Sequence, residues 1–154
     1  MDYVQGIRKL IGHRPLILVG ATILVIDNKN QLLMQKRADN GTWGVPGGSM
    51  NPGETLEETA RRETLEETGI RLDKIKFINI FSGPELFYKY PNGDQIYIVT
   101  AVYLAKEFTQ TKQGHDEEVL EIRFYPLDNL PENISPSIQI ILNELKPQLL
   151  ANAL

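Results

Sequence analysis

The hydrophobic residues of the chain fall into short runs separated by polar turns. Residues 16–26 form a run rich in isoleucine, leucine and valine, which is typical of a buried strand. The polar cluster over residues 27–30 predicts a turn that leads the chain into a second strand over residues 31–37. The pattern also predicts strands over residues 72–81, 95–105 and 121–125, with a turn over residues 90–94 before the second of these.

Two further segments have the pattern of helices. Residues 54 or 55 to 68 predict a helix, which Gly69 is well placed to end. Residues 135 to about 146 predict a closing helix, with Pro136 in its first turn and Pro147 just beyond its end. The order of strands, helix, strands and helix favours a mixed sheet with helices packed on it over a doubly wound fold.

Composition limits the classes to which this chain can belong. Its 154 residues, 42% of them hydrophobic and 23% charged, are ordinary for one compact domain, so we expect a single domain over residues 1–154. The absence of cysteine excludes disulfides, thiolate zinc sites and cysteine nucleophiles. The net charge of −4 argues against stable binding to nucleic acid or to a membrane surface. The run over residues 16–26 is shorter than the roughly 20 residues of a membrane span, and a cytoplasmic location is expected.

The first predicted helix carries an unusual group of carboxylates. Glu63, Glu66 and Glu67 are i, i+3 and i+4 neighbours, so they share an arc of about 100° on one side of the helix. A solvated acidic face is the ordinary explanation for such a pattern. Here the same side also carries Leu56 and Ala60, so it is expected to face other parts of the protein along some of its length.

A glycine-rich segment precedes this helix. The prolines and glycines of Trp43-Gly44-Val45-Pro46-Gly47-Gly48 exclude a helix and predict a shaped loop whose backbone can approach a ligand closely. Clustered carboxylates suit hard cations such as Mg²⁺ or Mn²⁺, and these cations bind phosphate oxygens. The spacing therefore suggests metal and phosphate chemistry, without identifying a substrate.

These residues resemble the Nudix box, a pattern written G-x5-E-x7-R-E-U-x-E-E-x-G-U, in which U is a bulky aliphatic residue. All the fixed positions match, and they are Gly48, Glu54, Arg62, Glu63, Glu66, Glu67 and Gly69, with Ile70 at the last aliphatic position. Thr64 occupies another aliphatic position, a departure expected to loosen packing under the helix. The resemblance implies an α/β/α sandwich around a mixed β-sheet, with its core over about residues 16–145.

The resemblance also implies roles for individual residues. Glu63 and Glu67 match the main metal ligands, and the Gly48 carbonyl often joins them. Glu66 matches a carboxylate that binds metal directly or through water. Glu54 matches a residue that supports the site, and Arg62 matches an arginine that holds the carboxylates through charge-assisted hydrogen bonds.

The catalytic base varies within this family. In similar enzymes, the loop before the strand at residues 121–125 supplies a late metal ligand or a base, which favours Glu118, with Glu117 as the second choice. The alternative is a solvated acidic loop, and in that case Glu66 or Glu63 becomes the candidate base. His115 is a candidate for contacting phosphate, although a surface position is the ordinary role for such a histidine.

The expected reaction is the metal-dependent hydrolysis of a diphosphate linkage in a nucleoside diphosphate joined to another group. Nucleotide sugars such as ADP-ribose and nucleoside triphosphates rank equally as substrates. Five aromatic residues are candidates either for base stacking or for the core: Phe81, Phe87, Tyr88, Tyr90 and Tyr97. A non-catalytic nucleotide sensor is the alternative function, and isoprenoid diphosphate isomerisation is disfavoured because the isomerases of this family use a cysteine. A homodimer remains open.

Overall fold

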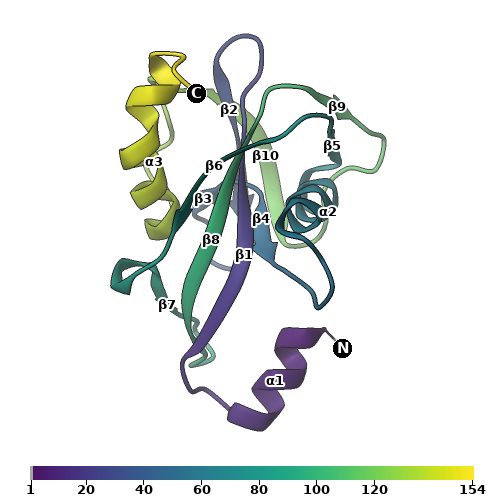
Figure 1. The fold of residues 1–154 in the computed structure, drawn as a ribbon, viewed down its shortest axis with the longest axis vertical. Helices are drawn as coiled ribbons and strands as arrows, with labels where there is room; N and C mark the ends of the chain where they lie inside the picture. Colours follow the sequence, from purple (N-terminus) through teal and green to yellow (C-terminus); the bar gives the residue numbers. More distant parts are fainter. Residues whose placement is uncertain (1) are drawn as a thin grey trace.

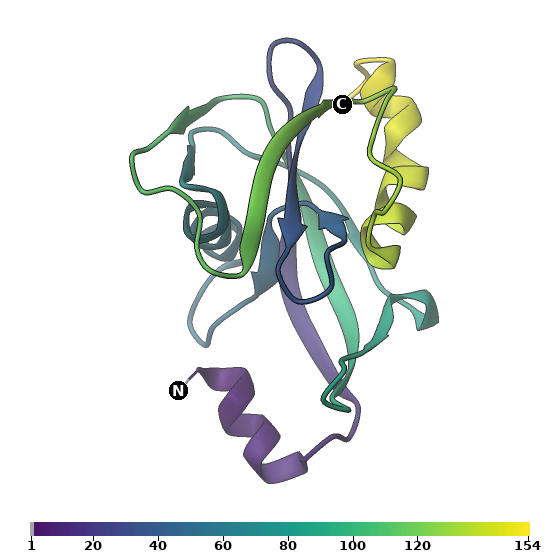
Figure 2. The ribbon, with the colours of Figure 1, turned by 180° about the vertical axis from the view of Figure 1, so that it is seen from behind.

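The computed structural model describes residues 2–154. Its strands form a central layer, with α2 (Leu56–Thr68) on one side and α3 (Pro136–Leu150) on the other (Figure 1). The view from behind shows the same two helices flanking the strands (Figure 2). This arrangement confirms the predicted mixed sheet between helices.

The larger sheet has five strands, in the order β4-β1-β8-β6, with β7 also paired to β8. The two long central strands, β1 (Leu16–Val25) and β8 (Gln95–Ala105), are parallel and paired from end to end. The outer strands β4 (Gly47–Ser49), β6 (Lys76–Phe81) and β7 (Phe87–Lys89) are antiparallel to their neighbours. A single-turn helix, η1 (Pro84–Leu86), leads into β7.

Two smaller sheets complete the strand layer. One is the antiparallel sheet of β10 (Val119–Pro126), β2 (Gln31–Arg37) and β3 (Trp43–Gly44), in that order. The other pairs β5 (Ile70–Leu72) with β9 (Phe108–Gln110). The strands predicted over residues 16–26, 31–37, 95–105 and 121–125 are confirmed, with differences of one or two residues at their ends.

The apolar side chains form two cores, one under each flanking helix. Leu24 of β1 belongs to the core under α3, which contains Ile141 and Leu142. Its neighbour Ile23 belongs to the core under α2, which contains Ala60. Because successive side chains of a strand point to opposite faces, one continuous apolar run in β1 supplies both cores.

The structure corrects two predicted boundaries. The expected strand over residues 72–81 is divided into β5 and β6, because the Asp73 N–H donates to the Glu107 carbonyl at 3.0 Å and the chain leaves one sheet for another. The closing helix does not end before Pro147 but runs to Leu150 with Pro147 inside it. Leu149 is buried in the core, and this burial offsets the helical hydrogen bond that proline cannot donate.

An N-terminal helix, α1 (Tyr3–Ile11), was not predicted. It lies beside the lower end of the strands, apart from α2 and α3 (Figure 1). Arg8 attaches it to the start of β8, because its guanidinium donates to the carbonyl oxygens of Arg14 and Gln95, each at 2.5 Å. The same group lies 3.7 Å from the Asp94 carboxylate, and only 11% of the Arg8 side chain is exposed.

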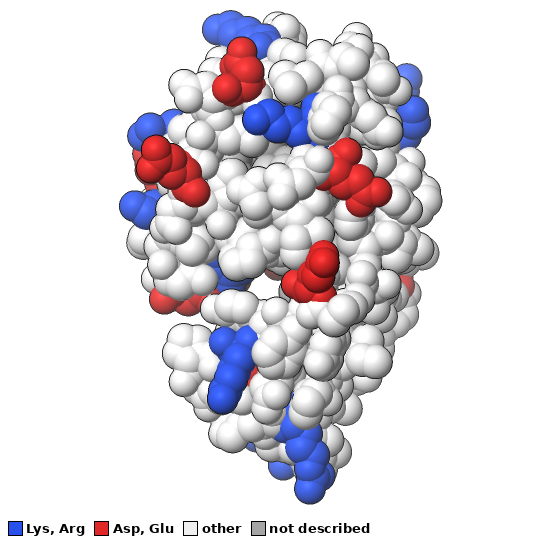
Figure 3. All heavy atoms as spheres, turned by 90° about the vertical axis from the view of Figure 1, so that its left-hand side faces the viewer, with Lys and Arg blue, Asp and Glu red and all other residues white. Residues whose placement is uncertain are grey.

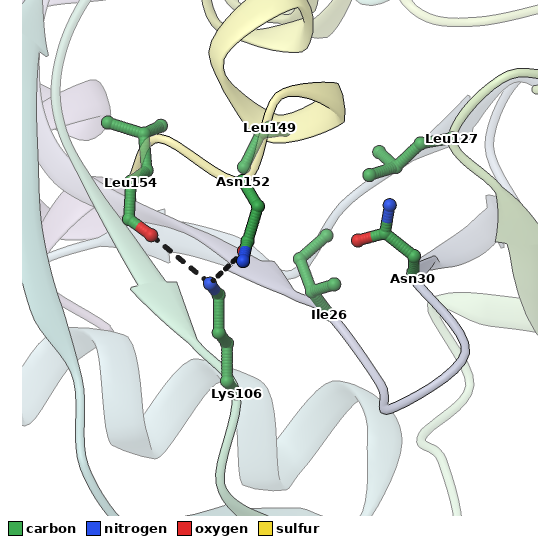
Figure 4. Close-up of a pocket in the computed structure, with 7 residues that line it drawn as sticks. All are labelled: Ile26, Asn30, Lys106, Leu127, Leu149, Asn152 and Leu154. Atoms are coloured by element: carbon green, nitrogen blue, oxygen red, sulfur yellow. Dashed lines mark hydrogen bonds between the residues drawn. The ribbon is translucent and has the colours of Figure 1, made fainter.

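At the opposite end of the molecule, Lys106 fixes the last residues against the core. Its amino group donates to the Asn152 side chain and to the Leu154 carbonyl, both at 3.1 Å (Figure 4). The space between these residues and Leu149 is about 10 Å³, close to the minimum for one water molecule. This feature therefore closes the end of the core and provides no room for a ligand.

The surface carries charges of both signs. On the face seen from the α3 side, basic and acidic side chains are interspersed among uncharged residues (Figure 3). Within residues 2–154, the helices are all too short or too polar to cross a membrane.

Candidate active site: a carboxylate-lined cavity

One cavity, of about 1000 Å³, lies where the strands meet α2. Its floor consists of side chains from β1 and β8 that point to one face of the larger sheet: Leu18, Gly20, Thr22, Ile96, Ile98 and Thr100. The carboxylates of α2 and the glycines of β4 line one wall, and residues 116–118 line another. Asp2 and Val4 at the start of α1 and Ser135 before α3 also border it.

Local contacts determine where α2 begins and ends. The Thr55 hydroxyl accepts from the Glu58 N–H at 3.1 Å, and the Glu58 carboxylate accepts from the Thr55 N–H at 2.8 Å, forming a capping box. Gly69 ends the helix in the left-handed conformation, with φ of 73°. The predicted helix over residues 55–68 is therefore confirmed.

The buried side of α2 is unusually polar. Its buried residues are Thr59, Ala60, Thr64, Glu67 and Thr68. Thr64 and Thr68 donate their hydroxyls to carbonyl oxygens one turn earlier in the helix, so neither hydroxyl is left without a partner. Thr64, which stands at an aliphatic position of the Nudix box, is fully buried.

Glu67 is the most buried carboxylate of the cavity, with 6% of the residue exposed. Each of its oxygens accepts one hydrogen bond from a neutral group: Oε1 from the Gly47 N–H at 3.1 Å, and Oε2 from the side-chain amide of Gln35. Burial raises the pKa of Glu67 well above its ordinary value, and the nearby Glu63 adds to this effect.

Glu63 lies against the backbone of β4. A Cβ atom at Gly48 would lie 2.5 Å from the Glu63 carboxyl carbon, so only glycine allows this approach. The Gly48 carbonyl oxygen itself packs against Gly20 of β1, where an added Cβ would lie 2.1 Å from it. Burial also raises the pKa of Glu63, although a hydrogen bond from Arg62 opposes this shift.

Arg62 connects the remaining carboxylates. Its guanidinium contacts Glu54 at 2.5 and 3.0 Å, Glu63 at 2.8 Å and Glu66 at 3.3 Å. It also donates to the Ser49 carbonyl at 3.0 Å. The hydrogen bonds that Arg62 donates to Glu54 lower the pKa of this carboxyl group to about 2. Glu54 therefore stays ionised and keeps Arg62 beside β4.

Glu66 differs from its two neighbours, because 51% of its side chain is exposed. It lines the cavity, and its carboxylate contacts Arg62. Among residues 2–154, the structure does not bring three acidic or histidine side chains together as a ready set of metal ligands. Glu63 and Glu67 are thus the closely associated pair, with Glu66 at their edge.

The acidic loop over residues 114–118 follows a segment that is hydrogen-bonded to the C-terminal end of α2. The N–H and hydroxyl of Thr111 both donate to the Gly69 carbonyl, and Gln113 donates to the Leu65 carbonyl at 3.3 Å. Glu117 and Glu118 both line the cavity, together with Asp116. The structure therefore places these three carboxylates on the wall that α2 does not supply.

The main chain of Glu118 fixes the end of this loop. Its carbonyl accepts from the Ala38 N–H at 2.9 Å, and its own N–H donates to the Asp116 carboxylate at 3.0 Å. His115 is exposed and lies outside the cavity lining, with its ring contacting the Asp116 carbonyl at 3.1 Å. The structure does not bring His115 together with the carboxylates of α2.

Of the five aromatic residues considered for stacking, Tyr90 lines the cavity. Tyr88 packs against it, with ring centroids 4.8 Å apart. Phe81 belongs to the core under α3, whereas Phe87 and Tyr97 pack against each other with centroids 5.1 Å apart.

Sequence reasoning missed one polar residue of the cavity, Gln35, and assigned to another, Arg37, the ordinary role of a surface residue rather than contact with phosphate. Gln35 and Arg37 point from β2 into the cavity, following the buried Leu33 on the same face of the strand. Arg37 forms two hydrogen bonds with Asp39, at 3.0 and 2.8 Å. The sequence did contain a signal for Gln35. In a strand, residues two apart lie on the same face, so Gln35 places a polar group on the face that Leu33 buries.

Comparison with known proteins agrees with this geometry. The NUDIX domain family model matches residues 17–145. A putative 8-oxo-dGTP diphosphatase of Bacillus subtilis is 41% identical over 43% of this chain and 44% of its own length. An ADP-ribose pyrophosphatase of Methanocaldococcus jannaschii is 35% identical over 70% of this chain and 62% of its own. The matches thus span less than two thirds of these two relatives.

A solved structure gives the same result for the fold. The MutT NUDIX hydrolase of Burkholderia pseudomallei superimposes with a TM-score of 0.70, covering 84% of this chain and 98% of its own, at 25% identity. The chain belongs to the NUDIX domain family, as the Nudix box predicted. Its mixed α/β architecture is that of Nudix hydrolase structures. Relatives named as diphosphatases and pyrophosphatases support the prediction of an enzyme.

Proposed function

We propose that this protein hydrolyses the diphosphate linkage of a nucleoside diphosphate joined to another group, by attack of water on phosphorus. The observation that carries the proposal is the pair of buried carboxylates, Glu63 and Glu67, in a cavity of about 1000 Å³. A cavity of this size can hold a nucleotide. Family membership supports this proposal. Nudix hydrolases generally need a divalent metal, which a pair of carboxylates can bind.

The residues present fit a hard divalent cation. Arg62 contacts Glu63, but the described partners of Glu67 are both neutral, so its charge lacks a positive neighbour. A buried carboxylate in this situation either keeps its proton or needs a cation. We propose that Glu63 and Glu67 hold Mg²⁺ or Mn²⁺, with Glu66 and the Gly48 carbonyl as the further ligands that the resemblance predicts.

The cation would supply Lewis-acid stabilisation of the phosphate charge and a lower pKa for the attacking water. The protein's own residues orient the other participants. Arg62 keeps Glu63 in place through a charge-assisted hydrogen bond, and the Gln35 amide and Gly47 N–H fix Glu67. The floor of β1 and β8 closes one side of the cavity.

Glu118 is the proposed general base, since it lies on the wall that α2 leaves without carboxylates. It would accept a proton from the attacking water, and it is also proposed as a late metal ligand. Glu117 lines the same wall and is the second candidate. If neither acts as the base, Glu66 or Glu63 takes that role.

The names of the relatives support nucleotides as the substrate class. One is a pyrophosphatase of ADP-ribose and another a putative diphosphatase of 8-oxo-dGTP. We therefore keep nucleotide sugars and nucleoside triphosphates as equal candidates. A sensor that binds nucleotide without hydrolysis is the alternative, and the retained carboxylate pair argues against it.

Chromatographic detection of the nucleotide product, over a panel of nucleotide sugars and nucleoside triphosphates with and without Mg²⁺, tests this proposal. We expect metal-dependent turnover of at least one class. Nucleotide binding without turnover at any Mg²⁺ or Mn²⁺ concentration would instead support the sensor.

A further inference from the structure

Gln35 contains a buried polar atom that forms no hydrogen bond with the rest of the protein. The residue is only 5% exposed and points from β2 into the cavity. Its amide nitrogen donates to Glu67 Oε2, but its carbonyl oxygen, Oε1, has no hydrogen-bond partner. In residues 2–154 it is the one buried side-chain nitrogen or oxygen left in this state.

The orientation of this amide follows from chemistry. An ionised carboxylate accepts hydrogen bonds and cannot donate them, so only the nitrogen end of the amide can face an ionised Glu67. The carbonyl end must then point elsewhere. A buried acceptor without a partner costs about 1–3 kcal/mol, which natural structures usually avoid.

The surroundings of Gln35 indicate what kind of partner is missing. Oε1 belongs to the same planar amide as the nitrogen that contacts Glu67, so it lies beside the proposed cation site. Phosphate oxygens are acceptors and cannot bond to it. Donors are available from two sources, namely water that accompanies a divalent cation and a hydroxyl or amino group of the nucleotide.

We propose that Gln35 is a positioning residue for the bound ligand. Its nitrogen holds the Glu67 carboxylate in the orientation that binds the cation, and its carbonyl oxygen accepts a hydrogen bond from a donor that enters with the ligand. This inference rests on the proposed function in taking Glu67 as a cation-binding carboxylate. It explains why a polar side chain occupies the buried face of β2 directly after Leu33.

The test compares Gln35→Met with a matched control, Gln31→Met. Both variants replace glutamine with an apolar side chain of similar length on the same face of β2, but Gln31 lies outside the cavity. Calorimetric titration with Mn²⁺ alone, without nucleotide, measures cation affinity independently of turnover. We expect Gln35→Met to weaken Mn²⁺ binding 10- to 100-fold, the range for outer-shell partners of a metal site, and Gln31→Met to change it less than about twofold.

A second titration, with a nucleotide at saturating Mn²⁺, distinguishes the two sources of the donor. Unchanged nucleotide affinity in Gln35→Met assigns the donor to water that accompanies the cation. An additional loss of nucleotide affinity assigns it to the nucleotide. Both results support the positioning role.

Thermal unfolding without metal separates positioning from a merely structural role. A lower unfolding temperature of Gln35→Met combined with unchanged Mn²⁺ affinity would overturn the inference. Gln35→Leu provides a second apolar variant if Gln35→Met does not fold. If the wild-type protein itself binds no Mn²⁺, or if Glu67→Gln binds it equally well, the proposed cation site fails, whatever Gln35 does.

Discussion

Two helices border the same cavity, and the protein holds them in opposite ways. α2 buries a mostly polar side and is fixed by its capping box, by Arg62 and by the contacts of Thr111 and Gln113 with its last carbonyl oxygens. α1 has no buried residue, although its sequence is strongly amphipathic, and it is attached by the contacts of Arg8 and of His13 just beyond its end.

This difference shows that an amphipathic pattern and a fixed position are separate properties. The apolar stripe of α1 remains partly exposed, with Leu10 at 81%. The carboxylate side of α2 contains little apolar surface, yet within residues 2–154 the buried side-chain nitrogens and oxygens all have a hydrogen-bond partner except the Gln35 carbonyl oxygen. α2 therefore carries the groups on which the proposed reaction depends, whereas α1 borders the same cavity through Asp2 and Val4 at its start.

The largest expected effect comes from the fixed helix. Glu67→Gln should lower turnover by more than about 100-fold at limiting Mg²⁺, because a neutral amide is a poor ligand and outer-shell changes alone cost 10–100-fold. Chromatographic detection of the nucleotide product measures turnover, and circular dichroism checks that the helix is retained. Glu57→Gln, an exposed change on the same helix, serves as the control. Wild-type turnover in Glu67→Gln would remove Glu67 from the site.

The next effect concerns the acidic residues 116–118, which line the cavity from outside α2. Glu118→Gln should lower turnover by about 10²-fold or more at saturating Mg²⁺, in the range for acid–base groups. The affinity for Mg²⁺ should fall less than in Glu67→Gln. Glu117→Gln is the paired comparison. If Glu117 proves to be the sensitive position, the assignment is wrong by one residue, and if both variants are active the base lies on α2.

A smaller effect is expected from releasing α1. Arg8→Ala removes the contacts with the Arg14 and Gln95 carbonyls, and Asp2 and Val4 then no longer form a fixed wall of the cavity. We expect KM to rise about tenfold, equivalent to about 1.4 kcal/mol, with kcat within about twofold. Steady-state kinetics beside Lys9→Ala, an exposed change on the same helix, measures this. A fall in kcat with unchanged KM would place α1 in the chemistry instead.

The smallest effect is a pH dependence of the α1 attachment. The hydrogen bond with His13, at 2.8 Å, lowers the pKa of Asp94 below its ordinary value. Because the pKa of Asp94 is lower in the folded state, its ionised form stabilises the attachment at pH values above the unfolded pKa of about 3.9. This stabilisation is lost as the pH falls through the pKa of Asp94 in the folded state. Amide exchange in α1, relative to α2, should therefore become faster below about pH 4. In Asp94→Asn this extra pH dependence should vanish.

The sequence predicted the parts of the fold that local chemistry determines. The signals of α2 lie within or next to it, at Thr55, Glu58 and Gly69. α1 was missed because its attachment joins Arg8 to Gln95, a contact between distant parts of the chain. The division of β5 from β6 likewise depends on Asp73 meeting Glu107. Pro147 was misjudged because the burial of Leu149 outweighs the local preference of proline.

The same distinction between local and long-range contacts applies to the candidate site. Spacing on a helix places Glu63 and Glu67 together, and the structure has them on one cavity wall. That Glu66 turns outward toward Arg62 was not evident from spacing, because it depends on how Arg62 is shared among three carboxylates. Gln35 reaches Glu67 from a strand 32 positions earlier in the chain, so only the folded structure reveals the contact.

The parallel pairing of β1 with β8 has a consequence for how the molecule folds. The two strands pair from Leu16 with Ile96 to Val25 with Ala105, so each pair joins residues about 80 positions apart. Closing so long a loop is slow compared with forming a helix such as α2, whose hydrogen bonds are local. During synthesis, the floor of the cavity therefore forms only after β8 has been made. Until then, the acidic helix can pack against β1 and β4, but without the strand that completes the centre of the sheet.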